Sequence, residues 1–179
     1  MIRYNYAFII GKNMIRCAKI ALVWSAAFFV SLVALSNITD YGTNYAFVSH
    51  VLSMDTIFAD SQLGGRAIVS PLLHHLAYWL IIAGQIMVGL LCWWGGWRMW
   101  RRRRERAQNF AAAKKMAVAG LTLGVLLWFV GFISVGGEWF LMWQSQTWNA
   151  QRTAFSLSII FMLLLIYVSL PDGEDRGGE

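Results

Sequence analysis

The feature that most constrains this chain is a set of four long stretches that contain no Asp, Glu, Lys or Arg. They run over residues 20–39, 67–97, 116–137 and 153–171. A membrane span needs about 20 mainly apolar residues, and each stretch is close to that length or longer. Composition agrees, because 58% of the residues are hydrophobic and only 13% are charged, against about 25% in ordinary soluble domains. The sequence therefore predicts a polytopic membrane protein.

The spanning segments are expected to be helices, because backbone polar groups in hydrocarbon must be satisfied by an α-helix or a closed β-barrel. The alternating strand-and-turn rhythm of an outer-membrane barrel is missing from the sequence. We therefore expect an all-α fold, with one membrane domain over residues 1–179. Its four transmembrane helices are placed at about 17–38, 68–97, 113–137 and 153–170. The basic region before the first stretch is long for a signal peptide, so we expect that stretch to remain as a helix.

The basic residues are distributed very unevenly between the connections. Of 15 Lys and Arg, only Arg66 and Arg152 lie in the first and third connections. The others lie before the first helix, between the second and third helices, and at Arg176 in the tail. Because short connections rich in Lys and Arg stay in the cytoplasm, this predicts an N-in, C-in topology. Residues 40–66 and 138–152 are then outside.

The run "RMWRRRRERAQ" at residues 98–108 is the densest part of this charge. A basic run that directly follows a membrane span is typically a topology determinant that also attracts anionic lipid. Nucleic acid is therefore not expected as a partner, and the net charge of +6 is interpreted as an orientation signal.

Side chains capable of chemistry gather on the predicted outer side. About 20 residues at 1.5 Å each cross the hydrocarbon, which places all three histidines and four carboxylates at or beyond the outer boundary. The candidates for a polar cluster are Asp40, His50, Asp55, His74, His75 and Glu138. Ionisable groups near hydrocarbon are functional candidates by default, although groups at its boundary can still reach water. The alternatives are therefore a site joining Glu138 to a histidine and an aspartate, or an ordinary polar cap.

The stretch "GGEWFLMWQSQTWNAQ" combines this glutamate with an aromatic group. Trp139, Trp143 and Trp148 lie at the depth where indole rings favour the membrane interface. The amides around them can satisfy backbone groups where the helix gives way to a loop. In the first outer connection, Phe47, Val48, Val51 and Leu52 follow helical spacing, which predicts a short interfacial helix.

Small residues indicate how the helices pack. Gly120 and Gly124 form a G-x-x-x-G pair, which is typical of close helix packing, either within the chain or with another subunit. Ser70 before Pro71 is a typical helix start for the second span. Cys17 and Cys92 fall at predicted cytoplasmic helix ends, so we expect reduced, packing cysteines and no disulfide.

No ligand is predicted from the residues alone. Imidazole with carboxylate suits a metal, but the chain has no H-E-x-x-H, E-x-x-H or C-x-x-C spacing. A bis-histidine haem needs histidines on facing helices, whereas only the second span carries any. A quinone or lipid pocket near His75, Tyr78 and Trp79 is an equal alternative. The cofactor and the metal therefore stay unknown.

Four stretches of this chain resemble a known family. They are "NITDYGTNYAFVSHVLSMDTIF", "HHLAYWLIIAGQ", "GLTLGVLLWFVGF" and "GGEWFLMWQSQTWNAQ". They are similar to a bacterial family of predicted small integral membrane proteins of unknown function, over about residues 19–170. The motifs N-x-T-D-Y and G-G-E-W-F-x-M-W-Q-S are the most distinctive part of the resemblance. It implies four helices and an inner-membrane location, but no activity, substrate or catalytic residue.

Two classes of function follow from these observations. The first is an accessory or assembly subunit of a larger inner-membrane complex, in contact with the lipid bilayer and with a membrane protein partner or a second copy of the chain. The second is a metal-, haem- or quinone-binding redox protein or enzyme that uses the outer-face cluster. A transporter is disfavoured, because the only polar side chain at mid-depth on the second helix is Gln85. The lack of a recognised catalytic spacing favours the non-enzymatic class.

Overall fold

The structure is a computed structural model that describes residues 2–172, with side chains described for residues 13–172. Arg3, Lys12 and Arg176, which entered the prediction of orientation, lie outside the described side chains. Within the described part, regular structure is helical throughout. Four helical stretches are long and apolar enough to cross a membrane, at residues 13–39, 71–102, 115–139 and 151–169. The prediction of four long apolar helices is confirmed.

The first two helices are separated by a single residue. α1 (Ile2–Thr39) ends before Asp40, whose backbone leaves helical geometry, and α2 (Tyr41–Ser53) begins directly after it. α2 buries Val48 in a cluster with Tyr78 and Ile82 of the next long helix. The short helix predicted in this connection is therefore present, and it packs against the bundle.

The second span, α3 (Pro71–Arg102), starts at the predicted proline and follows a short 3₁₀ turn, η1 (Gly64–Arg66). Ser70 is its N-cap residue, but the side chain makes no capping hydrogen bond, and the backbone oxygen accepts from His74 N at 3.1 Å instead. The helix extends beyond the predicted end at residue 97 because arginine is a good helix former. It therefore carries the first arginines of the basic run on its last turn.

The third span departs from the sequence prediction. It consists of α5 (Lys115–Leu126) and a π-helix, η2 (Leu127–Trp139), and the short α4 (Ala107–Ala113) precedes it. The backbone bond from Phe140 N to Val135 O, at 3.0 Å, shows the wider i→i−5 geometry. The expectation of a continuous α-helix over 113–137 was wrong because apolar composition does not distinguish the two kinds of turn. π-Helical segments are rare and frequently lie at functional sites.

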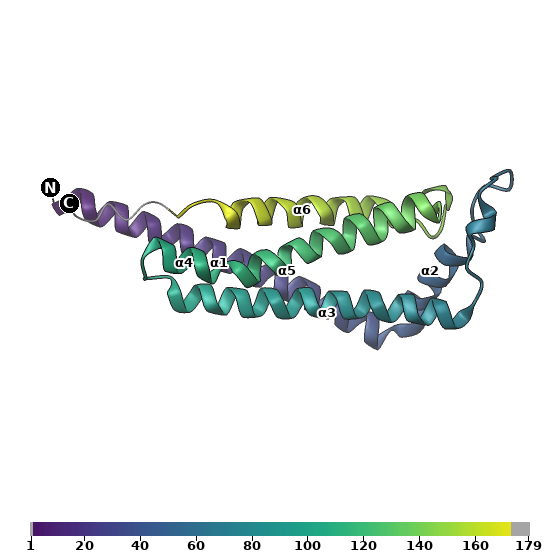
Figure 1. The fold of residues 1–179 in the computed structure, drawn as a ribbon, viewed down its shortest axis with the longest axis horizontal. Coiled ribbons are helices and arrows are strands. Elements are labelled where there is room, and N and C mark those ends of the chain that lie inside the picture. The colour runs from purple at the N-terminus through teal and green to yellow at the C-terminus, as the bar shows by residue number, and fades with distance from the viewer. Residues whose placement is uncertain (1, 173–179) are drawn as a thin grey trace.

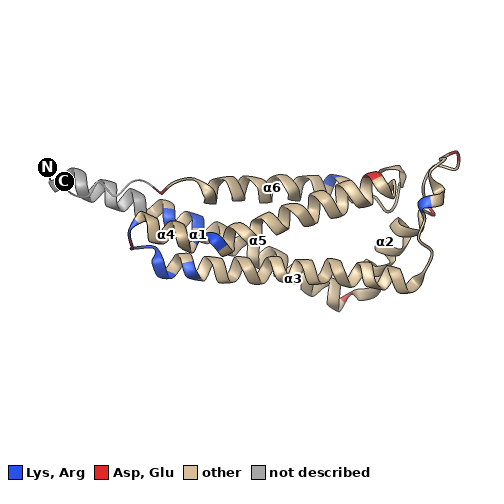
Figure 2. Ribbon diagram, viewed as in Figure 1, with Lys and Arg blue, Asp and Glu red and all other residues tan. Residues whose placement is uncertain are grey.

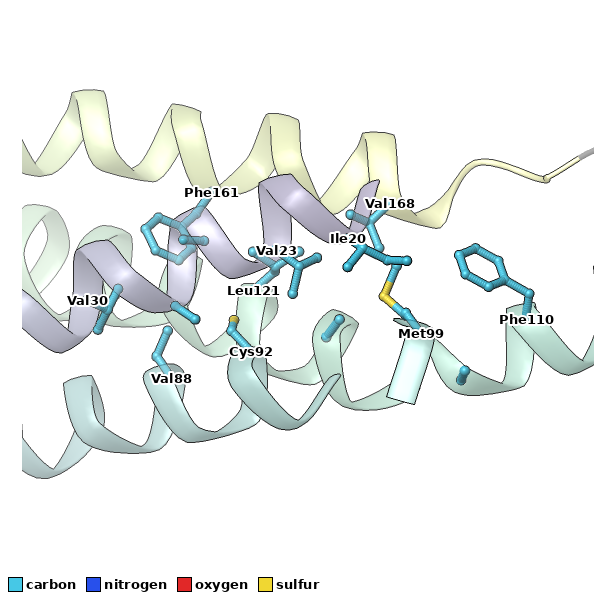
Figure 3. Close-up of a cluster of buried hydrophobic side chains, with 14 of the residues drawn as sticks. Ile20, Val23, Val30, Val88, Cys92, Met99, Phe110, Leu121, Phe161 and Val168 are labelled. Carbon is cyan, nitrogen blue, oxygen red and sulfur yellow. The ribbon is translucent and has the colours of Figure 1, made fainter. Parts of the chain in front are cut away.

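The last two helices complete the bundle. η3 (Met142–Gln144) is a short 3₁₀ turn after η2, and α6 (Gln151–Ser169) is the fourth span. α1 packs on α3, α3 on α5, and α5 on α6. Figure 3 shows side chains from all four helices, including Val23, Leu121 and Phe161, gathered in one buried apolar core.

The two glycines of the G-x-x-x-G pair lie at close contacts inside the chain. A Cβ atom on Gly120 would be 2.8 Å from Sγ of Cys92 on α3, and one on Gly124 would overlap the ring of Phe161 on α6. α5 can therefore approach both neighbours closely only because these positions carry no side chain. The structure places the partners of this groove within the same chain.

The bundle has two different ends. The basic end comprises residues 13–19, 98–115 and 170–172, and the α2 end comprises residues 40–75 and 135–152. Toward the α2 end, η2 and α6 diverge from α3, as Figure 1 shows. The described charged residues lie at the two ends and leave a long uncharged middle (Figure 2). The predicted site residues all belong to the α2 end.

Candidate functional site

The two connections at the α2 end are tied together by hydrogen bonds. Thr56 Oγ1 donates to Ser145 Oγ at 2.9 Å, Phe58 N donates to Gln144 Oε1 at 3.0 Å, and Arg66 Nη1 donates to Trp139 O at 3.3 Å. Gln144 therefore satisfies a backbone group, as predicted for the amides of this stretch, but the group belongs to the other connection. We call residues 41–70 together with residues 139–150 the cap.

An apolar cluster holds the cap from within. Its buried members are Val51, Met54, Phe140, Leu141 and Met142. Met54 and Leu141 have φ of 52° and 55°, a left-handed conformation that is costly for side chains with a Cβ. Met54 is the C-cap of α2 and Leu141 the N-cap of the 3₁₀ turn η3, and their burial in the cluster offsets that cost. The cap is therefore a packed unit.

His74 is buried and has both ring nitrogens bonded. Its Nε2 lies 2.6 Å from Ile68 O, and its Nδ1 lies 2.9 Å from Ser49 Oγ. Because a carbonyl oxygen can only accept, the ring carries a proton on Nε2 and donates it to Ile68 O. His74 thus ties the connection before α3 to α2.

The other two histidines lie nearer the surface. His75 bonds to the hydroxyl of Tyr41 through Nδ1 at 2.7 Å, and its ring stacks on Tyr45 with centroids 4.1 Å apart. His50 pairs with Asp55 at 2.6 Å and stacks on Trp148 at 4.5 Å. The structure therefore brings one predicted histidine and one predicted aspartate together.

Glu138 does not join these groups. It is exposed, and within residues 13–172 its side chain makes no hydrogen bond or ion pair. Asp40 is also exposed, and its backbone rather than its carboxylate bonds to Asn44. In the described part of the chain, no three His, Cys, Asp or Glu residues are placed to hold a metal ion. Four of the six candidates are thus divided between three separate sets of contacts, and the carboxylates of Asp40 and Glu138 make no hydrogen bond among the described residues.

The three tryptophans of the cap differ in their surroundings. Trp148 is half-buried against His50 and Phe47. Trp143 is exposed and meets Phe58 edge-on at 5.8 Å, and Trp139 is exposed beneath the guanidinium of Arg66 at 4.5 Å. One indole therefore holds the cap together, and two form part of its surface.

An apolar cavity of about 260 Å³ lies beneath the cap, between α2, α3 and η2. It is lined almost entirely by hydrocarbon, including Val48, Leu80 and Phe132. Nearby on η2, Trp128 Nε1 is buried and has no hydrogen-bond partner among residues 13–172. The divergence of η2 from α3 creates this space, and the glycines at 131 and 136 were its only signal in the sequence.

A polar contact that the sequence did not predict joins α1 to α3 below the cap. Asn37 Nδ2 donates to Gln85 Oε1 at 2.8 Å, and the Tyr78 hydroxyl donates to Asn37 O at 2.8 Å. Gln85 and Tyr78 are buried. The mid-depth glutamine is thus a bonded packing residue.

Buried charges at the basic end were also missed. Lys19 and Lys114 both form ion pairs with Asp172, at 2.8 Å for Lys19, and both donate to Leu170 O at 2.6 and 2.9 Å. Burial lowers the pKa of Lys114, and Asp172 opposes that change. Arg16 lies beside them, donating to Arg103 O and Glu105 O at 3.0 and 2.6 Å. The two lysines fix the chain after α6 against α1 and against the junction of α4 and α5, and Arg16 fixes α1 against the connection between α3 and α4.

Comparisons with known proteins identify the family of the chain. A search of curated proteins and a search of solved structures return no match. One family model covers residues 15–171, which include all four long apolar helices and the cap. The chain is therefore a multi-pass integral membrane protein that belongs to the family described as "Predicted small integral membrane protein (DUF2165)".

Proposed function

We propose that this protein is a non-enzymatic accessory or assembly subunit of a larger bacterial inner-membrane complex. One observation carries the proposal. Side chains of Thr56, Arg66 and Gln144 hold the two connections of the cap together by hydrogen bonds, while aromatic side chains are left exposed on its surface. Such a cap is suited to binding another protein.

The orientation of the bundle supports this assignment. Short connections rich in Lys and Arg stay in the cytoplasm, which puts the basic end inside and the cap on the periplasmic face. The predicted aromatic interface of Trp139, Trp143 and Trp148 then lies at the outer boundary of the membrane. From that position the cap can reach the outer surface of a neighbouring membrane protein.

The exposed aromatic residues form a candidate docking patch. Phe58, Trp139 and Trp143 are 49%, 54% and 43% exposed, and Arg66 covers part of Trp139. Tryptophan and arginine are enriched among the residues that dominate binding energy at protein interfaces. The packed cap holds these side chains in place, so binding would cost little ordering.

Co-purification tests the docking patch. The protein is purified from its native host in mild detergent, and its partners are identified by mass spectrometry. Phe58→Ala with Trp143→Ala should lower the yield of a stoichiometric partner by about tenfold or more, since loss of a hot-spot residue costs at least about 2 kcal/mol.

The matched control is Phe28→Ala with Phe29→Ala, because both side chains are exposed on the spanning part of α1, away from the cap. This control should retain the partner. Equal retention in both variants would show that the patch does not dock the partner. Purification without any stoichiometric partner would overturn the accessory function.

The apolar cavity favours a second candidate, the binding of a hydrophobic ligand. A space of about 260 Å³ between α2, α3 and η2 suits the acyl chain of a lipid or the tail of a quinone. Solvent extraction of the purified protein, followed by mass spectrometry, an optical spectrum and metal analysis, tests this alternative. A retained quinone, haem or metal at one per chain would favour the redox class.

A further inference from the structure

The basic end contains a second hollow, far from the cap and independent of the function proposed for it. A groove of about 580 Å³ lies between the end of α3 and α4. On the α3 side it is lined by Trp97, Arg98, Arg101 and Arg102, and Asn109 and Ala112 lie on the α4 side. The small alanine leaves room in the groove, and the guanidinium groups give it positive charge.

The three arginines of the groove are not equivalent. Arg102 Nη1 is paired with Glu105 Oε2 at 2.7 Å, and the same oxygen accepts from Asn109 Nδ2 at 2.9 Å. The hydrogen bond from Arg102 lowers the pKa of Glu105, so this carboxylate stays ionised and balances one arginine. Arg98 and Arg101 have no carboxylate partner among the described residues. Two positive charges in the groove are thus left for a ligand.

The geometry of these groups suits phosphate. A guanidinium presents parallel N–H donors that match two phosphate oxygens, which makes arginine the preferred side chain for planar, bidentate recognition. Arg101 lies over the ring of Trp97 with its Cζ 5.1 Å from the centroid, which restricts its motion. A ligand with one or two phosphate groups would therefore meet donors that are already oriented.

The surroundings of the groove indicate a lipid. Trp93, Trp94 and Trp97 are all exposed on α3 next to the arginines, and Leu90 is exposed one turn further along. Indole rings favour the headgroup level of a bilayer, and the apolar surface below them can contact acyl chains. Basic pockets of this kind at the end of membrane helices bind anionic headgroups. We propose that this groove is a binding site for the phosphate headgroup of an anionic phospholipid.

Lipid titration of the full-length protein in detergent tests the site. The probe is cardiolipin, a lipid with two phosphates, and native mass spectrometry measures the fraction of protein with bound lipid. Each basic residue near a membrane surface contributes about 1 kcal/mol to the binding of anionic lipid. Arg98→Gln with Arg101→Gln should therefore weaken cardiolipin binding about 30-fold.

The control removes the same charge from outside the groove. Arg104 and Arg106 are exposed and do not line the groove, so Arg104→Gln with Arg106→Gln should stay within about threefold of wild type, because a headgroup held in the groove would make no direct contact with them. Equal losses in both double variants would mean a diffuse charge effect and would overturn the site. Equal binding of zwitterionic phosphatidylethanolamine would also overturn it. If inorganic phosphate alone, at the same phosphate concentration, occupied the site as fully as cardiolipin does, the ligand would be a soluble anion and the lipid proposal would be overturned.

Discussion

At the scale of single residues, the ion pairs at the basic end are the most consequential charges in the described part of the chain. The side chains of Lys19, Lys114 and Asp172 are only 1%, 7% and 2% exposed. One carboxylate and the Leu170 carbonyl oxygen serve two ammonium groups. Taking such charges out of water is costly, and their mutual attraction repays that cost only while every partner is present.

Asp172→Asn should therefore destabilise the protein strongly. It leaves two buried lysines without a counter-charge, and removing one partner of a buried pair costs about 3 to 5 kcal/mol. Thermal unfolding in detergent is the measurement, with Asp60→Asn and Glu138→Gln as controls because both carboxylates are exposed. The buried-pair explanation fails if all three variants melt at the same temperature.

The predictability of the cap also differed from residue to residue. Counting residues across the hydrocarbon placed the histidines and Glu138 at the same end, as the structure does. Counting residues could not predict the direction in which each of these side chains points. A change from i→i−4 to i→i−5 bonding in η2 rotates every later side chain, and Glu138 follows eleven residues of that segment. His50 and Asp55 met because α2 ends between them.

At the scale of elements, α5 and η2 are one span with two geometries. α5 packs closely on α3 and α6 through Gly120 and Gly124, whereas η2 diverges from α3 and leaves the apolar cavity. The glycine pair was readable from the sequence because its spacing matches one helix face. The π-helix was not, because it depends on how the segment packs.

Gly120→Ala tests this packing. Alanine is the better helix former by about 1 kcal/mol, yet its Cβ would lie 2.8 Å from Cys92 Sγ and 3.0 Å from the Cys92 backbone nitrogen. We expect a net loss of about 1 to 3 kcal/mol, as is typical of an overpacked core. Gly42→Ala, where a Cβ meets nothing within 4 Å, should be neutral or stabilising in the same unfolding assay. A stabilising Gly120→Ala would contradict the close approach of α3 and α5.

At the scale of the whole molecule, the two ends of the bundle differ in the kinds of side chain that they contain. The basic end has buried ion pairs and an arginine-lined groove, and the α2 end has a packed cap over an apolar cavity. The orientation of these ends in a membrane determines what each can meet.

Cysteine labelling tests the proposed orientation. In a background without Cys17 and Cys92, a membrane-impermeant thiol reagent is added to intact spheroplasts of cells that carry Asp60→Cys or Gln108→Cys. Because the basic end is assigned to the cytoplasm, Asp60→Cys should react from outside and Gln108→Cys only after the membrane is opened. The reverse pattern would contradict the N-in, C-in topology.

The sequence by itself determined the class of fold and the separation of charge. Long charge-free stretches must become helices in hydrocarbon, because no other open structure satisfies the backbone there, and uneven basic residues predict orientation through a rule that needs no contacts. Only the tertiary structure decided which side chains meet. The contact between Gln144 and Phe58 joins residues 86 positions apart, and that between Lys19 and Asp172 joins residues 153 apart. Such pairs depend on helix rotation and tilt, which are set by packing against neighbouring helices and leave no periodic trace in the chain.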